Sequence, residues 1–200
     1  FWVGANHWLP IPTVGGVRQT LFAHWHEGLI YMACVLAILI AHEMGHFLAT
    51  IRYRIPASFP YFIPFPISPI GTMGAVIGMD GLKADRKELF DIGLAGPLAG
   101  LVVAIPVMWF GISQLDFTQV AYGPFAMDLP LAVRVALRHI QPPGYGSENV
   151  VWFSHLNPYF MAGWVGFLIT GLNMMPVSQL DGGHVMYTVW GTRARWVARI

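Results

Sequence analysis

Three long apolar segments dominate the pattern of hydrophobic and polar positions along the chain. They cover residues 28–51, 93–115 and 157–177, and each is close to the roughly 20 residues that a helix needs to cross a hydrocarbon core. Small residues recur within the second and third segments, which favours close packing of helices in lipid. Pro106 predicts a kink in the second segment. The pattern therefore predicts three membrane helices.

The stretch that follows the first segment is apolar, but it cannot form one continuous helix. Residues 55–79 contain five prolines, namely Pro56, Pro60, Pro64, Pro66 and Pro69, and proline in a helix interior removes a hydrogen bond and clashes with the preceding turn. Non-helical backbone at membrane depth must be covered by protein or line a wet cavity. We expect either a loop on the bilayer surface, or a re-entrant loop or short strand pair that borders a site.

The basic residues give the segments an orientation. The loop 116–156 carries only Arg134 and Arg138. Eight basic residues lie in 52–91 or after the third segment: Arg52, Arg54, Lys83, Arg86, Lys87, Arg193, Arg195 and Arg199. Because basic loops stay in the cytoplasm, we expect a multi-pass integral membrane protein in which the first and third segments both end at the cytoplasmic face.

The composition agrees with a membrane protein and narrows its partners. Hydrophobic residues make up 56% of the chain and charged residues 10%, whereas soluble domains carry about 25% charged residues. The net charge is +1, and no basic run indicates a nucleic-acid partner. We therefore expect the lipid bilayer as a partner and no nucleic acid.

A short motif near the end of the first segment carries chemistry. Residues 42–46 read HEMGH, and because residues four apart lie on one face of a helix, both His42 and His46 can reach one zinc ion. Glu43 then lies beside the metal, where it can take a proton from zinc-bound water and pass it to the leaving amine. Ionisable residues within an apolar segment are costly, which indicates a function for them.

A catalytic zinc site uses three protein ligands and keeps one position open. The sequence LDGGH at 180–184 offers Asp181, which the predicted topology brings to the same face as His46. The two glycines allow the chain to approach closely. His184 is the alternative ligand, and DGG by itself is also typical of a simple turn. The residues alone leave this choice open.

Together these motifs resemble the site-2 protease family of intramembrane zinc metalloproteases. The resemblance rests on HEMGH, on NMMPVSQLDGGH at 173–184, which is similar to the family pattern N-x-x-P-x-x-x-L-D-G, and on GLAGPLAG at 93–100, which resembles the glycine-proline motif of the intervening helix. It covers about 28–184. It implies one zinc ion per chain on His42, His46 and Asp181, with Glu43 as general base.

The resemblance also implies a role for Asn173, whose amide matches the family pattern. It can donate a hydrogen bond to the oxyanion or the substrate backbone, although a bond between helices explains it equally well. Residues 71–74 resemble the family segment that pairs with an extended substrate. The loop 116–156 is too short and rich in turns for an inserted PDZ domain, which indicates the branch without one. His155 receives no role, because the His-Pro pair of close relatives is absent.

We therefore expect an all-α polytopic membrane protein with three core transmembrane helices that carry the zinc site, and a proline-rich re-entrant or β-like loop after the first. Residues 1–27 would be an interfacial segment or the end of a preceding helix, 28–184 the metalloprotease core, and 185–200 the start of a basic amphipathic segment. Because the chain begins at Phe1 and ends within that segment, we expect a fragment of a longer protein.

The expected function is that of a zinc metalloendopeptidase, which hydrolyses a peptide bond in or near a transmembrane segment of a membrane-anchored protein. A membrane metal transporter and an inactive protease-like scaffold are the alternatives. A transporter predicts further ligands along a path, but no ionisable residue lies between Asp91 and Asp116. A scaffold is expected to have lost Glu43 or a ligand, and all four residues are present.

Overall fold

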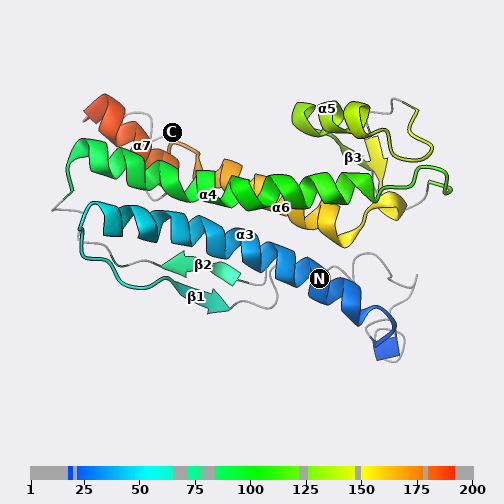
Figure 1. Cartoon of the computed structure of the whole chain (residues 1–200), viewed down its shortest axis with the longest axis horizontal. Coiled ribbons are helices and arrows are strands. Elements are labelled where there is room, and N and C mark those ends of the chain that lie inside the picture. The colour runs from blue at the N-terminus through cyan, green and yellow to red at the C-terminus, as the bar shows by residue number, and fades with distance from the viewer. Residues whose placement is uncertain are drawn as a thin grey trace. The chain divides into compact units, whose positions relative to one another are not determined.

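The computed structural model describes residues 18–19, 22–64, 72–76, 78, 84–121, 126–146, 150–177 and 180–191. It contains two compact units. The first unit consists of Phe1–Cys34 and Ile105–Trp164, and the second unit of Val35–Ala104 and Val165–Ile200. Helices α3, α4 and α6, which are labelled in Figure 1, each contribute residues to both units.

The two longest helices correspond to the first two apolar segments. Helix α3 covers Trp25–Arg52 and helix α4 covers Arg86–Ser113. Each has 28 residues and is therefore about 42 Å long, more than the roughly 30 Å of a hydrocarbon core. Both are long and apolar enough to cross a membrane. Helix α4 begins earlier than its apolar segment, because the Glu88 carboxylate accepts a hydrogen bond from the Asp85 backbone N–H, 2.9 Å away, and caps the first turn.

The third apolar segment forms a shorter helix than the pattern predicted. Helix α6 covers Pro158–Asn173, with 16 residues and a length of about 24 Å. The chain leaves the helix before Pro176, which lacks the N–H that another helical turn would need. Helix α7, Asp181–Trp190, follows. Among the described residues, two helices rather than the predicted three have the length and hydropathy of a membrane span.

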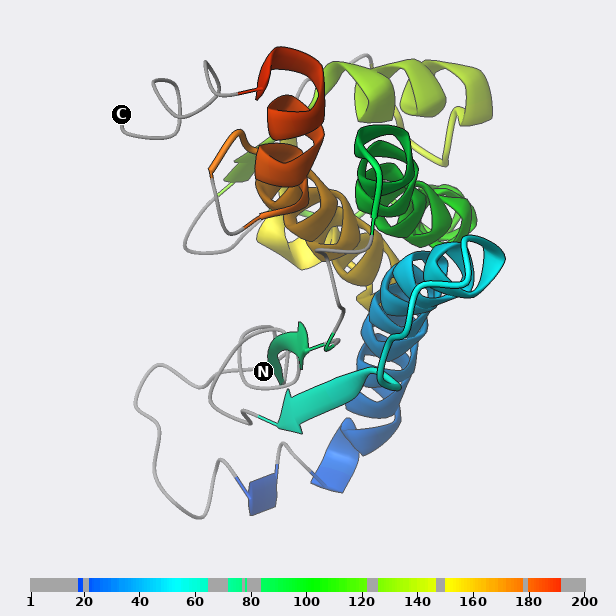
Figure 2. The ribbon, with the colours of Figure 1, turned by 90° about the vertical axis from the view of Figure 1, so that its left-hand side faces the viewer.

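The described residues are mostly helical, as the sequence predicted, and the proline-rich stretch after the first apolar segment contains a pair of short strands. Strands β1 (Tyr61–Pro64) and β2 (Thr72–Val76) pair antiparallel within the proline-rich stretch, with Tyr61 opposite Val76. The prolines exclude a continuous helix here, and Pro64 is tolerated in β1 because both strands of a two-stranded sheet are edge strands. The pair runs below α3 in Figure 1, and Figure 2 shows that it extends away from the side of that helix. Its depth in a membrane stays a prediction.

The first unit contains elements that the sequence analysis did not assign. Strands β3 (Ala126–Asp128) and β4 (Val150–Trp152) pair antiparallel. Helix α5, Leu131–Ile140, buries Val133 and Leu137, and a 3-10 turn, η2, covers Phe153–His155.

One side chain joins α4 to α6 within the first unit. The Asn157 Oδ1 atom accepts a hydrogen bond from the Phe160 N–H, 2.9 Å away, and so caps α6. The Asn157 amide also donates to the Gly111 carbonyl of α4, at 2.8 Å. The two helices approach closely here, because a Cβ on Gly111 would lie 2.3 Å from the Phe160 nitrogen.

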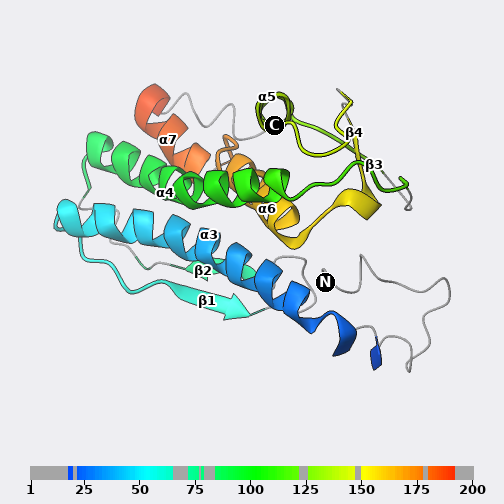
Figure 3. The same cartoon turned by 45° about the vertical axis from the view of Figure 1, so that its right-hand side comes forward.

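In the second unit, the part of α4 before Ala104 lies between α3 and α7 (Figures 1 and 3). The contact with α3 is close, since a Cβ on Gly45 would lie 2.4 Å from the Ala95 carbonyl oxygen and 2.7 Å from the Ala99 Cβ. On the other side, a Cβ on Gly93 would lie 3.1 Å from the Val185 side chain of α7. Small residues thus let α4 approach both neighbours, as in other close pairs of membrane helices.

Candidate metal centre

The helical repeat of α3 brings His42 and His46 together. Their ring centroids are 5.0 Å apart and their Nε2 atoms 3.3 Å apart. His42 is buried, with 3% of its surface exposed, and His46 is mostly buried. Glu43, at the next position of the same helix, interacts electrostatically with both histidines and with Asp181. The Glu43 carboxylate is therefore close enough to both imidazoles to interact with them.

Asp181, the first residue of α7, lies beside both histidines. Its Oδ2 atom lies 3.1 Å from His42 Nε2 and 3.3 Å from His46 Nε2. A glycine is required at the next position, because a Cβ on Gly182 would lie 2.1 Å from the Met174 carbonyl oxygen. His184 is exposed and is not part of the group. Of the two ligands that the sequence left open, Asp181 is the one that meets the histidines.

The charge of Asp181 suits a ligand. Burial opposes ionisation of its carboxyl group, yet the adjacent side chains of His42 and His46 hold the pKa of Asp181 well below its usual range. The group is therefore a carboxylate at neutral pH. Metal ions bind the deprotonated form of such ligands.

The spacing of the three donor atoms fits a tetrahedral ion. The separations are 3.1, 3.3 and 3.3 Å. Zinc–ligand bonds of about 2.0–2.1 Å in a tetrahedron place the donors about 3.3–3.4 Å apart. Two imidazole nitrogens and one carboxylate oxygen are a set that catalytic zinc sites use, and such sites keep the fourth position open. The residues present thus fit zinc.

Helix α4 provides none of these three donors, but it contacts both histidines. The His46 Nδ1–H donates to the Ile92 carbonyl oxygen at 2.8 Å. A Cβ on Gly96 would lie 2.0 Å from His46 Nε2, and one on Gly100 would lie 3.3 Å from His42 Nδ1. The GLAGPLAG motif thus packs against the site. Sequence reasoning missed Ile92, because a backbone carbonyl leaves no mark in the residue type.

Asn173, the last residue of α6, also lies at the site. Its side-chain amide is 3.3 Å from His42 Nε2. The segment before β1 is held nearby, since the rings of Phe47 and Phe59 lie with centroids 5.0 Å apart, and Phe47 directly follows His46. Of the segment 71–74, the structure describes Thr72–Gly74, which belong to β2; Gly71 lies outside the described residues.

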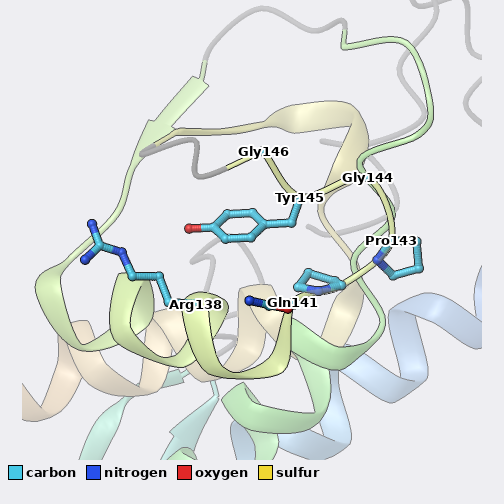
Figure 4. A pocket seen from close by; sticks show the side chains of 7 residues that line it. Arg138, Gln141, Pro143, Gly144, Tyr145 and Gly146 are labelled. Atoms are coloured by element: carbon cyan, nitrogen blue, oxygen red, sulfur yellow. The ribbon is translucent and has the colours of Figure 1, made fainter.

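A separate cavity lies in the first unit, at the C-terminal end of α5 (Figure 4). Its volume is about 670 Å³, and the side chains of Arg138 and Tyr145 border it. Its other lining residues are Gln141, Pro142, Pro143, Gly144 and Gly146. None of the predicted site residues lines it. Its lining residues include no histidine, cysteine or carboxylate for a metal.

Comparison with known proteins agrees with this geometry. Residues 30–199 match the model of peptidase family M50. The chain is 34% identical over 169 residues to the probable zinc metalloprotease EGY1, chloroplastic, of Arabidopsis thaliana, which covers 80% of this chain and 29% of that protein. The protein of the same name from Oryza sativa subsp. japonica is also 34% identical, over 80% of this chain and 28% of its own length. EGY2 of Arabidopsis thaliana is 27% identical over 174 residues, 83% of this chain and 29% of its own.

This chain thus spans less than a third of the length of these relatives. The family match nevertheless covers the histidines, Asp181 and Asn173 together with α4. The chain therefore belongs to peptidase family M50, the site-2 protease family that its motifs resemble.

Proposed function

We propose that this chain is the catalytic core of an intramembrane zinc metalloprotease, formed by residues 28–184. The observation that carries the proposal is the triangle of His42 Nε2, His46 Nε2 and Asp181 Oδ2, with sides of 3.1–3.3 Å. Two of its corners belong to a helix long and apolar enough to cross a membrane. The names of the relatives, probable zinc metalloproteases, agree with it.

Each residue at the site then has a task. His42, His46 and Asp181 hold the zinc ion, which when bound supplies a Lewis acid that polarises a peptide carbonyl and makes water more acidic. Glu43 accepts a proton from the attacking water and passes it to the leaving amine. The Asn173 amide, 3.3 Å from His42 Nε2, donates a hydrogen bond to the carbonyl oxygen as negative charge develops on it.

The substrate is a membrane-anchored protein that unwinds where it is cut. A helix keeps its carbonyl groups in internal hydrogen bonds, so the scissile bond must lie in extended chain. Strand β2 offers an edge for such a chain, since strand addition supplies main-chain hydrogen bonds without strong sequence demands. The eight basic residues in 52–91 and after the third apolar segment, against two in 116–156, support a multi-pass topology with the site near the cytoplasmic face.

The test replaces Glu43 with Gln in the purified protein reconstituted in lipid vesicles. Gln keeps the size of the side chain but cannot accept the proton. We expect zinc to stay bound at wild-type stoichiometry, while cleavage of a membrane-anchored model substrate falls by at least about 100-fold, as for the loss of a general base.

Glu88→Gln is the matched control, because Gln can keep the capping bond to Asp85 and should leave cleavage unchanged. Cleavage at the wild-type rate by Glu43→Gln with zinc bound would contradict the mechanism. A wild-type protein that binds zinc and cleaves no substrate would instead indicate the inactive scaffold.

A further inference from the structure

Helix α4 carries the glycines Gly96 and Gly100 on the surface that faces the metal centre. A Cβ on Gly96 would lie 2.0 Å from His46 Nε2 and 2.4 Å from both Cδ2 and Cε1. These distances are far below van der Waals contact, so the imidazole occupies the space that any other residue at 96 would fill. Gly100, one turn later, has its Cβ position 3.3 Å from the His42 Cβ and Nδ1. The fit is therefore tight under His46 and looser under His42.

The same helix determines which nitrogen of His46 carries a proton. The Nδ1 atom lies 2.8 Å from the Ile92 carbonyl oxygen. A carbonyl can only accept, so Nδ1 must be the donor, and in the neutral imidazole Nε2 then keeps the free lone pair. Ile92 and Gly96 are four residues apart and lie on one face of α4. One face of α4 thus fixes both the position of the His46 ring and the nitrogen that carries its proton.

A contact outside the site holds Ile92 in register with His46. The Tyr53 hydroxyl, just beyond the end of α3, donates a hydrogen bond to the carboxylate of Asp91, the residue before Ile92. Little room is left for the ring to move, because the His46 side chain is only 13% exposed. The imidazole is thus confined by Gly96, by the Ile92 carbonyl and by its neighbours on α3.

We propose that α4 is the positioning element of the metal centre, with Gly96 seating the His46 ring and the Ile92 carbonyl holding its Nδ1 proton, so that Nε2 faces the ion. Gly96 is a positioning residue that never touches the metal. The inference rests on the proposed function, because it assumes that His46 is a ligand. It adds that α4, which supplies none of the three proposed ligands, affects how tightly those ligands bind the metal ion.

The test is Gly96→Ala, with Co²⁺ alone as the probe. The added Cβ meets the tip of a side chain rather than backbone, so the metal-free fold should survive while the ring is displaced. We expect Co²⁺ affinity, measured by competition with a chelator, to fall about 10- to 100-fold, as when other groups that orient a ligand are lost. The Co²⁺ absorption spectrum should also change, which a simple loss of stability would not cause.

Two glycines of the same helix serve as controls. In Gly111→Ala the added Cβ would lie 2.3 Å from the Phe160 nitrogen, so the metal-free Tm should fall with no change in affinity or spectrum. Gly100→Ala, with contacts of 3.3 Å to His42, should reduce affinity less than Gly96→Ala. Wild-type affinity and spectrum in Gly96→Ala would overturn the inference, and so would an equal loss of affinity in Gly111→Ala.

A measurement on the wild-type protein covers the case in which Gly96→Ala does not fold. In ¹⁵N NMR spectra of the zinc-loaded protein, the His46 signals should show a protonated Nδ1 and a metal-bound Nε2. Zinc on Nδ1 would refute the inference and leave the proposed protease intact. A wild-type protein that binds no zinc would refute the proposed function itself.

Discussion

Helix α4 contacts a neighbour through a glycine in each of the two compact units, and the two contacts differ in kind. In the second unit, the position of a Cβ on Gly96 coincides with the imidazole of His46. In the first unit, the position of a Cβ on Gly111 coincides with the backbone of Phe160 at the start of α6. Gly96 makes room for the end of a side chain with a proposed chemical task, and Gly111 makes room for backbone.

The difference shows that replacing a glycine at a helix contact has no single expected effect, because the effect depends on which atoms the new Cβ would meet. Overpacking against backbone forces helices apart, at a cost of about 1–3 kcal/mol, and is therefore a matter of stability. Overpacking against a ring displaces the ring, and is therefore a matter of chemistry. The two units contain two further pairs of like residues, His42 with His155 and Asn173 with Asn157, that allow the same comparison.

The largest contrast is expected between His42 and His155, the two histidines that are buried among the described residues. His42→Ala removes a proposed ligand, so metal affinity should fall by more than about 100-fold, the upper end of what loss of an orienting group costs. His155→Ala removes a bond of 3.2 Å between Nε2 and the Gln119 carbonyl and a ring contact with Phe117. It should lower the Tm and leave metal binding intact. Chelator competition and thermal unfolding in detergent measure the two effects; a loss of metal by His155→Ala would break the comparison.

The two asparagines at the ends of α6 come next. Asn173→Ala should reduce kcat about 100- to 1,000-fold without loss of metal, if its amide stabilises the oxyanion. Asn157→Ala removes the cap of α6 and the bond to Gly111, which should cost about 1–2 kcal/mol of unfolding free energy and leave kcat unchanged.

Kinetics on the vesicle-embedded enzyme, with unfolding curves for both variants, decide between the two readings of Asn173. A normal kcat together with a lowered Tm in Asn173→Ala would assign that residue to helix packing instead.

The smallest effect is expected at Tyr53. Its hydrogen bond to Asp91 raises the pKa of the Tyr53 hydroxyl above its usual value of about 10. Because the folded-state pKa is raised, the bond stabilises the protein fully below that usual value and is lost as pH rises through the folded-state pKa. Tyr53→Phe should therefore lower the Tm slightly at pH 7, and the gap to the wild type should close in strong alkali. A gap independent of pH would contradict this account.

The sequence predicted the long helices better than the rest of the fold. Segments 28–51 and 93–115 lie almost wholly within α3 and α4, because long apolar runs have few other stable structures in lipid. The third segment was predicted too long, since apolar residues continue past Asn173 although the helix ends there. The strands of the first unit were missed, because three-residue strands leave no readable period.

At the candidate site too, the sequence predicted some features, and others depend on the tertiary structure. The sequence by itself determined that His42 and His46 share a face, because the helical repeat is a local property of the chain. It also supplied Glu43 beside them and offered Asp181 and His184 as a third ligand. Only the tertiary structure brought Asp181 Oδ2 to 3.1 Å from His42 and left His184 exposed. The Ile92 carbonyl and the space at Gly96 likewise contact His46 only because α4 packs against α3. The spacing of residues along the chain does not predict contacts between segments that are distant in sequence.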